Sequence, residues 1–317
     1  MRKTILGQTN LEVSYIGMGV LPIGPNQLSL PVDQGAMVIR YALDKGINFF
    51  DTAQYYQTYP YIKEALKGTN YNAVISSKSL AENYHEMMEA IEEARKSLDR
   101  DVIDIFLMHE VRTGDFGVRQ GAWEALNEAK TKGLVKAIGI STHNVDVTMD
   151  MARVTECDVV FPLINYAGLG IRNGKDAGTA EEMLAAIEKC SKAGKGTYGM
   201  KVFGGGNLTV NYQEALRFVT CRDYINSLMI GFGKTSDIDD IIDYVEGKME
   251  PGYNPDTTSK RLIIEQANCE GCGRCKAMCQ SEAIFYNKNG LAEIDPSKCL
   301  TCGYCAPVCP SRSIIFY

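Results

Sequence analysis

Short apolar runs rich in β-branched residues alternate with longer amphipathic stretches over the first 250 residues. The short runs predict buried strands, and the longer stretches predict helices with one apolar face. Strands are expected at 13–20, 47–53, 73–79, 102–109, 136–142, 158–166, 196–203 and 226–232. Helical periodicity is clearest at 81–100, 121–133 and 179–196, where Gly133 and Gly194 with nearby lysines mark ends.

Eight strands that alternate with helices predict an α/β fold of the (β/α)8, or TIM-barrel, type over residues 1–247. A doubly wound sheet is the second choice, and the count of eight strands and the length of the region favour the barrel. Residues 248–260 are rich in Pro, Gly and polar residues and are expected to be a linker. Residues 261–317 are then expected to form a small α+β domain.

Charge and hydropathy exclude some classes of partner. The net charge is −6, so a general nucleic-acid binder is not expected. The chain has no run of 18 apolar residues, so neither a transmembrane helix nor a membrane partner is expected. The opening MRKTILGQTNLEV lacks the continuous apolar stretch of a secretory signal, and a cytoplasmic location is therefore predicted.

Eight of the eleven cysteines follow residue 268, in two copies of the spacing C-x2-C-x2-C-x3-C. Clustered cysteines in a reducing compartment indicate metal ligands rather than disulfides. A zinc site pairs two C-x2-C knuckles and has no use for the further cysteines, although a zinc-binding tail stays as the alternative. The expected ligands are Cys269, Cys272, Cys275, Cys279, Cys299, Cys302, Cys305 and Cys309.

The repeated spacing resembles that of the bacterial two-cluster ferredoxins over about 55 residues, including Pro310 after the last cysteine. The resemblance implies two [4Fe–4S] clusters, with the fourth cysteine of each run bound to the other cluster. One cluster would take Cys269, Cys272, Cys275 and Cys309, and the second Cys299, Cys302, Cys305 and Cys279. Residues 283–295 also predict a hairpin with its turn at 287–290, and 313–317 a closing strand.

Four ionisable residues fall at the ends of three consecutive predicted strands: Asp51, Tyr56, Lys78 and His109. Taken singly, each has an ordinary structural explanation, such as a helix cap, packing or a solvated lysine. In a barrel, however, the carboxyl ends of the strands share one rim, where active sites are built. Together they predict a catalytic site.

The segments FFDTAQYY, VISSKS, DIFLMHE and GLVKAIGIST resemble the aldo-keto reductases at the Asp-Tyr-Lys-His tetrad of that family. With the C-terminal repeat, the chain resembles the iron–sulfur branch of the family. The resemblance implies an oxidoreductase that reduces a small-molecule carbonyl, or oxidises an alcohol, with NADP or NAD. Tyr56 would be the general acid and base, and His109 would bind the carbonyl oxygen. Lys78 would lower the pKa of Tyr56, and Asp51 would hold Lys78 charged.

Glycine-rich turns after the last two strands are the expected phosphate-binding loops, because backbone N–H groups can approach a pyrophosphate there. They supply Lys201, Gly231, Gly233 and Lys234, and Ser236 with Asp239 is expected to cap the following helix. The resemblance further implies that Ser141 and Asn165 contact the nicotinamide carboxamide. Phe161 stands near the place of the family's usual glutamine. The rim residues Arg112 and Arg172 are expected to be solvated.

Hydride transfer moves two electrons at once, whereas clusters move one at a time. The first hypothesis is therefore an enzyme whose clusters exchange electrons with a redox-protein partner, with a flavin as one conceivable converter. In the second, the chain is an electron-transfer protein whose barrel binds a ligand or partner without nicotinamide chemistry. In the third, the clusters only hold the small domain folded. The sequence identifies no particular substrate.

Overall fold

The computed structural model describes residues 1–256, 261–279, 282–299, 303 and 305–316. Eight parallel strands close a barrel in the order β11-β12-β3-β4-β5-β6-β7-β8, so the predicted (β/α)8 fold is confirmed. Each lies within an expected strand or one residue beyond it. Their bounds are β3 Ile16–Gly19, β4 Phe49–Asp51, β5 Val74–Ser79, β6 Ile103–Met108, β7 Val135–Thr142, β8 Val159–Pro162, β11 Gly196–Gly199 and β12 Ser227–Gly231.

The inside of the barrel is a packed apolar core, because alternate side chains of each strand point inward. Phe49, Ile105, Val159 and Tyr198 are among its fully buried members. A hairpin of β1 (Lys3–Ile5) and β2 (Glu12–Ser14) precedes the first barrel strand and adds Leu6, Leu11 and Val13 to the same core. The N-terminal end of the barrel is therefore sealed, and chemistry is confined to the opposite end.

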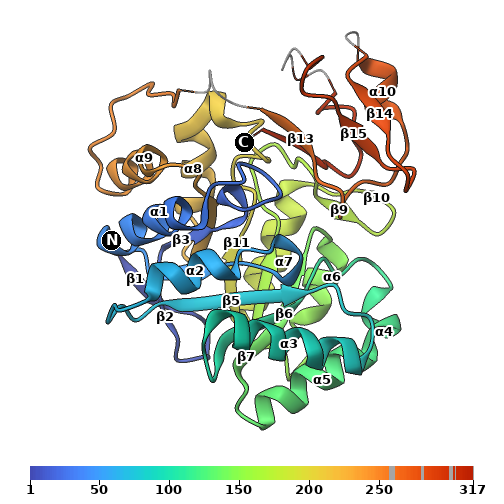
Figure 1. Ribbon diagram of the computed structural model, residues 1–317. Coiled ribbons are helices and arrows are strands. Elements are labelled where there is room, and N and C mark those ends of the chain that lie inside the picture. The colour runs from blue at the N-terminus through green and yellow to red at the C-terminus, as the bar shows by residue number, and fades with distance from the viewer. Residues whose placement is uncertain (257–260, 280–281, 300–302, 304, 317) are drawn as a thin grey trace.

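Helices cover the outside of the barrel with their apolar faces (Figure 1). Asn83 caps α3 by accepting from the Glu86 N–H at 3.1 Å, and Thr179 with Glu182 forms a capping box on α7. The helices of the barrel are α1 Val32–Asp44, α2 Tyr59–Leu66, α3 Tyr84–Leu98, α4 Asp115–Val118, α5 Gln120–Thr131, α6 Val145–Met151, α7 Ala180–Lys192, α8 Tyr212–Thr220 and α9 Thr235–Val245. Short 3-10 turns lie at Leu21–Ile23, Gln54–Tyr56 and Thr209–Asn211. Among the described residues, no helix has both the length and the apolarity to span a membrane.

The C-terminal segment forms a second, small core. Its elements are β13 Leu262–Ile264, α10 Arg274–Met278, β14 Ile284–Tyr286, β15 Ala292–Ile294 and β16 Ile314–Phe316. The predicted hairpin is confirmed as β14–β15, with the Asn287 N–H donating to Leu291 O at 2.9 Å. The predicted closing strand is β16, which pairs antiparallel with β13. Of the expected linker, residues 257–260 lie outside the described residues.

The small C-terminal domain lies against the C-terminal end of the barrel, beside β9 (Arg172–Asn173) and β10 (Asp176–Ala177) (Figure 1). The Phe316 N–H donates to Gly205 O at 2.8 Å, and Lys201 pairs with Glu265 at 3.1 Å. The expectation of solvated rim arginines is wrong for Arg172, which forms an ion pair with Glu270.

Arg112, the other rim arginine, is also not simply solvated. Its guanidinium pairs with Glu110 at 2.9 Å and reaches Ala267 O at 3.5 Å. Rim side chains that a lone barrel would expose to water therefore contact the C-terminal domain.

Candidate functional site

The loop that carries Tyr56 is fixed from several directions. It leaves β4 after Asp51 and forms the 3-10 turn Gln54–Tyr56. The hydroxyls of Thr52 and Thr58 are 2.7 Å apart across its base, and the Ser79 hydroxyl donates to Gln54 Oε1 at 2.7 Å. The phenol is thereby held above the mouth of the barrel, beside the ends of β5 and β6.

Lys78 and Asp51 form a buried ion pair at the ends of adjacent strands. Lys78 Nζ lies 2.5 Å from Asp51 Oδ1 and 2.7 Å from Thr52 O, and the residue is 1% exposed. Burial lowers the pKa of Lys78 and raises that of Asp51, while the attraction between the two charges opposes both shifts. The predicted role of Asp51, to hold Lys78 in place, agrees with this geometry.

Tyr56 joins the pair from the loop above. Lys78 Nζ lies 4.7 Å from the centroid of the Tyr56 ring, and the Tyr56 hydroxyl lies 3.5 Å from His109 Nε2. The structure thus brings together all four residues of the predicted tetrad.

The expectation that Lys78 lowers the pKa of Tyr56 is not met. The pKa of Tyr56 is raised well above its ordinary value, first by desolvation and then by the charges of Asp51, Glu265 and Glu110. The positive charge of Lys78 is offset by the negative charge of Asp51, with which it pairs. The Lys78 ammonium also faces the Tyr56 ring rather than the Tyr56 hydroxyl. Tyr56 therefore keeps its proton at neutral pH, which suits a proton donor.

His109 is buried at the end of β6 in the uncharged state. Burial, followed by the charge of Lys78, holds its pKa well below 6.5. Its backbone is fixed by the buried Arg119, whose guanidinium donates to His109 O at 2.9 Å and to Ser79 O at 3.1 Å. Sequence reasoning missed this arginine, because it lies at a helix boundary ten residues from the histidine.

Stability is expected to fall in acid through His109 and His143, whose folded-state pKa values are both depressed by burial. Above pH ~6.5 both histidines are neutral, folded or unfolded. Below it the unfolded chain takes up protons that the folded chain resists. Each of the two histidines then lowers the free energy of unfolding by about 1.4 kcal/mol for every pH unit of acidification. Denaturant titrations between pH 7 and 5 measure how steeply the free energy of unfolding falls with pH. His109→Gln or His143→Gln should each make this slope smaller.

The exposed His85 supplies the matched control, since it pairs only with Glu89 on the surface of α3. His85→Gln should leave the slope of the wild-type chain unchanged. Equal slopes for all three variants and the wild type would contradict the assignment of neutral histidines at the site.

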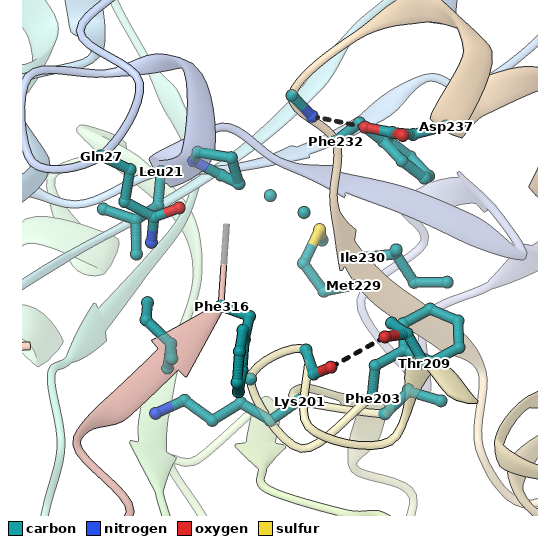
Figure 2. Close-up of a pocket in the computed structure, with 18 of the residues that line it drawn as sticks. Leu21, Gln27, Lys201, Phe203, Thr209, Met229, Ile230, Phe232, Asp237 and Phe316 are labelled. Carbon is teal, nitrogen blue, oxygen red and sulfur yellow. Dashed lines mark hydrogen bonds between the residues drawn. The ribbon is translucent and has the colours of Figure 1, made fainter. Parts of the chain in front are cut away.

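A cavity of about 490 Å³ opens next to the tetrad and is lined by Asp51 and Tyr56. Its walls come from the barrel strands, from the loops after β11 and β12, and from the C-terminal domain. Figure 2 shows Phe316 of β16 on one side of this space and Asp237 at the far side, with Met229 and Ile230 between. Glu265 and Phe316 belong to the site, and sequence reasoning missed both because they lie far along the chain.

The residues expected to hold a nicotinamide are only partly at the cavity. Lys201, Gly231, Gly233 and Lys234 line it. Ser141 and Asn165 are not among the described lining residues, and their side chains are engaged elsewhere. Ser141 Oγ accepts from the Glu110 N–H at 2.9 Å, and the Asn165 amide exchanges two hydrogen bonds with the Leu169 backbone.

The expected cap of Ser236 with Asp239 is wrong. Helix α9 begins at Thr235, and Asp237 supplies the cap: its Oδ2 accepts from the N–H groups of Gly233 at 3.0 Å and Lys234 at 3.2 Å. Asp239 instead accepts from the Tyr41 hydroxyl at 2.7 Å. The helix starts two residues earlier than the spacing suggested.

The cysteines gather in the core of the small domain. The pKa of Cys275 is raised first by burial and then by the charges of Cys309, Cys269 and Cys272. Cys275 and the sequence-distant Cys309 are buried in one core, and Cys269 packs against it, whereas Cys272 is exposed. Among the described residues, no group of three or more metal-ligating side chains is drawn together as a metal site. Cys279, Cys299 and Cys305 pack in the same core. Cys302 lies outside the described residues.

Comparison with known families gives two matches that follow each other along the chain. Residues 15–223 match the aldo/keto reductase family, and residues 268–313 match a 4Fe-4S dicluster domain. The first match covers the strands and loops that carry the tetrad, and the second covers the cysteine repeat.

Individual relatives resemble the barrel alone. L-galactose dehydrogenase of Arabidopsis thaliana is 28% identical over 51% of this chain and 56% of its own length. Methylglyoxal reductase DkgA of Escherichia coli O157:H7 is 31% identical over 62% of this chain and 72% of its own. An aldo-keto reductase structure from Bacillus halodurans, in its holo form, superposes with a TM-score of 0.63 at 17% identity, covering 78% of this chain and 91% of that one.

Proposed function

The chain belongs to the aldo/keto reductase family and continues into a 4Fe-4S dicluster domain, and from this premise we propose that it interconverts a small-molecule carbonyl and its alcohol at Tyr56. The electrons are exchanged with a redox-protein partner by way of the C-terminal domain. One observation carries the proposal: the tetrad opens on a cavity whose wall is completed by Glu265 and Phe316 of that domain.

The roles of the barrel residues follow from their contacts. Reduction adds two electrons and two protons to a carbonyl: R₂C=O + 2 e⁻ + 2 H⁺ → R₂CHOH. The neutral Tyr56 donates one proton to the oxygen, and the uncharged His109 beside it orients that oxygen. Lys78 presents a fixed positive charge under the ring as negative charge develops. Because the pKa of Tyr56 is raised, the phenol is in its protonated form at neutral pH, as the reductive direction requires.

The cysteine residues fit a pair of [4Fe–4S] clusters. Thiolates are the ligands such clusters require, and Cys275 and Cys309 lie in a small apolar core with Ile264 and Ile314, with Cys269 packed against it. When bound, the clusters would supply one-electron transfer. The chain's own contribution is to hold the thiols in this core and to join it to the barrel through β13 and β16.

The family also implies a nicotinamide dinucleotide as hydride donor. On the residues present, this group does not fit well. Ser141 and Asn165 are turned to backbone partners, and Asp237 accepts from the N–H groups of Gly233 and Lys234, the two residues that precede α9. The proposal therefore assigns the electrons to a reduced one-electron carrier of the ferredoxin or flavodoxin class.

Oxygen-free purification tests the proposal. About eight irons and eight sulfides per chain are expected, with EPR signals after reduction and carbonyl turnover when reduced methyl viologen supplies electrons. Cys272→Ala should lose iron, whereas Cys221→Ala, an exposed thiol outside the repeat, should not. A preparation without acid-labile sulfide would overturn the proposal. Reducible clusters without carbonyl turnover would favour an electron-transfer protein instead.

A further inference from the structure

The glycine-rich loop after β11 serves as a seat for the C-terminal domain. Gly205 and Gly206 have φ of +66° and +86°, and a Cβ on Gly206 would lie 2.8 Å from Phe316 Cβ and from Phe316 O. The Asn207 amide donates to Ile314 O at 3.4 Å, in addition to the Phe316–Gly205 hydrogen bond. These glycines therefore allow the loop backbone to lie close against β16 of the same chain.

In the second loop, after β12, backbone N–H groups that could bind an anion already donate to a carboxylate of the protein. Helix N-termini attract anions through unpaired N–H groups and the helix dipole. Here the Asp237 carboxylate accepts from the N–H groups of Gly233 and Lys234, the two residues before the helix, so a negative charge already stands at this helix end. A phosphate at this place would have to displace a carboxylate of the protein.

The charges around the cavity also oppose an anionic ligand. Besides Asp51, which pairs with Lys78, four carboxylates line it among the described residues, against two ammonium groups. The carboxylates are Asp237, Asp240, Asp256 and Glu265, and the ammonium groups are Lys201 and Lys234. Lys201 is paired with Glu265 at 3.1 Å. Like charges that line one cavity repel one another.

The rest of the wall is apolar and rich in aromatic rings. Phe161, Phe203, Phe232 and Phe316 contribute from different elements, and Met229 of the barrel strand β12 faces the same space (Figure 2). A volume of about 490 Å³ is within the range of roughly 300–1,000 Å³ usual for small-ligand sites.

Resting on the proposed function, we infer that this cavity takes a single uncharged or cationic carbonyl or alcohol substrate with an apolar, ring-containing body. The loops expected to bind a dinucleotide serve instead to seat the C-terminal domain and to give the cavity its negative charge. The electrons then come from the one-electron carrier named above.

Calorimetric binding to the holo chain under nitrogen tests the inference without turnover. The probes are benzaldehyde, its cationic 4-trimethylammonio and anionic 4-carboxy derivatives, and NADPH. The neutral and cationic aldehydes should bind at least ten-fold tighter than the anionic one, and NADPH no tighter than about 1 mM. Asp240→Asn should narrow the difference between cationic and anionic aldehydes several-fold, and Asp44→Asn, on an exposed carboxylate outside the lining, should not.

Gly206→Ala examines the seat itself. It should loosen aldehyde binding, because the new Cβ displaces Phe316, whereas Gly133→Ala has a similar positive φ but meets nothing within 4 Å and should not. Micromolar binding of NADPH, or tighter binding of the anionic aldehyde, would overturn the inference. Either result leaves the Tyr56 chemistry standing. Conversely, if the chain binds the neutral and cationic aldehydes more tightly than the anionic one but reduces no carbonyl, only the proposed function is contradicted.

Discussion

Tyr56→Phe is expected to lower kcat for carbonyl reduction by about 10²- to 10⁴-fold while the iron and sulfide content stays unchanged. The substitution removes one oxygen, the atom that lies 3.5 Å from His109 Nε2 and would protonate the substrate. The ring remains above Lys78, so packing and the Asp51–Lys78 pair are retained. Initial rates with reduced methyl viologen, together with EPR spectra of the same samples, measure both quantities.

Tyr55→Phe is the matched control, because the neighbouring tyrosine is exposed and does not line the cavity. It should retain full activity. The pH profile gives a second readout: since the pKa of Tyr56 is raised, the reductive rate should show no loss of the acid form up to about pH 9. A fully active Tyr56→Phe enzyme would remove Tyr56 from the mechanism.

The barrel and the tetrad could be predicted because both depend on short-range pattern. Strand runs such as 102–109 are mostly apolar, and barrel closure places the carboxyl ends of the strands on one rim. Asp51, Lys78 and His109 occupy those ends, so their proximity follows from topology alone. The cysteine spacing is equally local, and it predicts one shared cluster for Cys269, Cys272, Cys275 and the distant Cys309, of which Cys275 and Cys309 lie in one core.

Other features could not be predicted because they arise from contacts between the domains. Phe316 reaches Gly205 across more than 100 residues, and Glu265 reaches Lys201 across more than 60. The sequence pattern of the barrel loop does not indicate a contact with the C-terminal domain, and the pattern of that domain does not indicate a contact with the loop. Whether the pKa of Tyr56 is raised or lowered depends on two opposing effects, the desolvation of the phenol and the charge of Lys78. Asp51 offsets the charge of Lys78, and only the distances in the structure show which effect is larger.

The cap of α9 shows a subtler limit. The sequence TSDIDD offers several residues that can begin a helix, and spacing alone favoured Ser236 with Asp239. The structure selects Asp237, whose carboxylate turns back to the preceding glycine loop. The capping carboxylate lies two residues earlier than expected and accepts from the glycine loop itself, so a small local error altered the expected cofactor site.

Lys78→Met is expected to destabilise the barrel by about 3–5 kcal/mol, because it leaves the Asp51 carboxylate buried without its cation. Lys78 is 1% exposed and makes its two hydrogen bonds within the barrel mouth, so water cannot replace it without disrupting the core. Denaturant unfolding, followed by tyrosine and tryptophan fluorescence, measures the change in free energy. Activity should fall with it, since the positive charge under Tyr56 is also lost.

The same substitution on an exposed pair separates burial from the loss of a lysine. Lys3 pairs with Glu12 at 3.2 Å with side chains 46% and 59% exposed, so Lys3→Met should cost at most about 1 kcal/mol. The double variant Asp51→Leu with Lys78→Met removes both buried charges and should recover most of the stability. It should remain inactive, because stability and proton donation depend on the pair in different ways. Equal costs for Lys3→Met and Lys78→Met, or an active double variant, would contradict the role assigned to this ion pair.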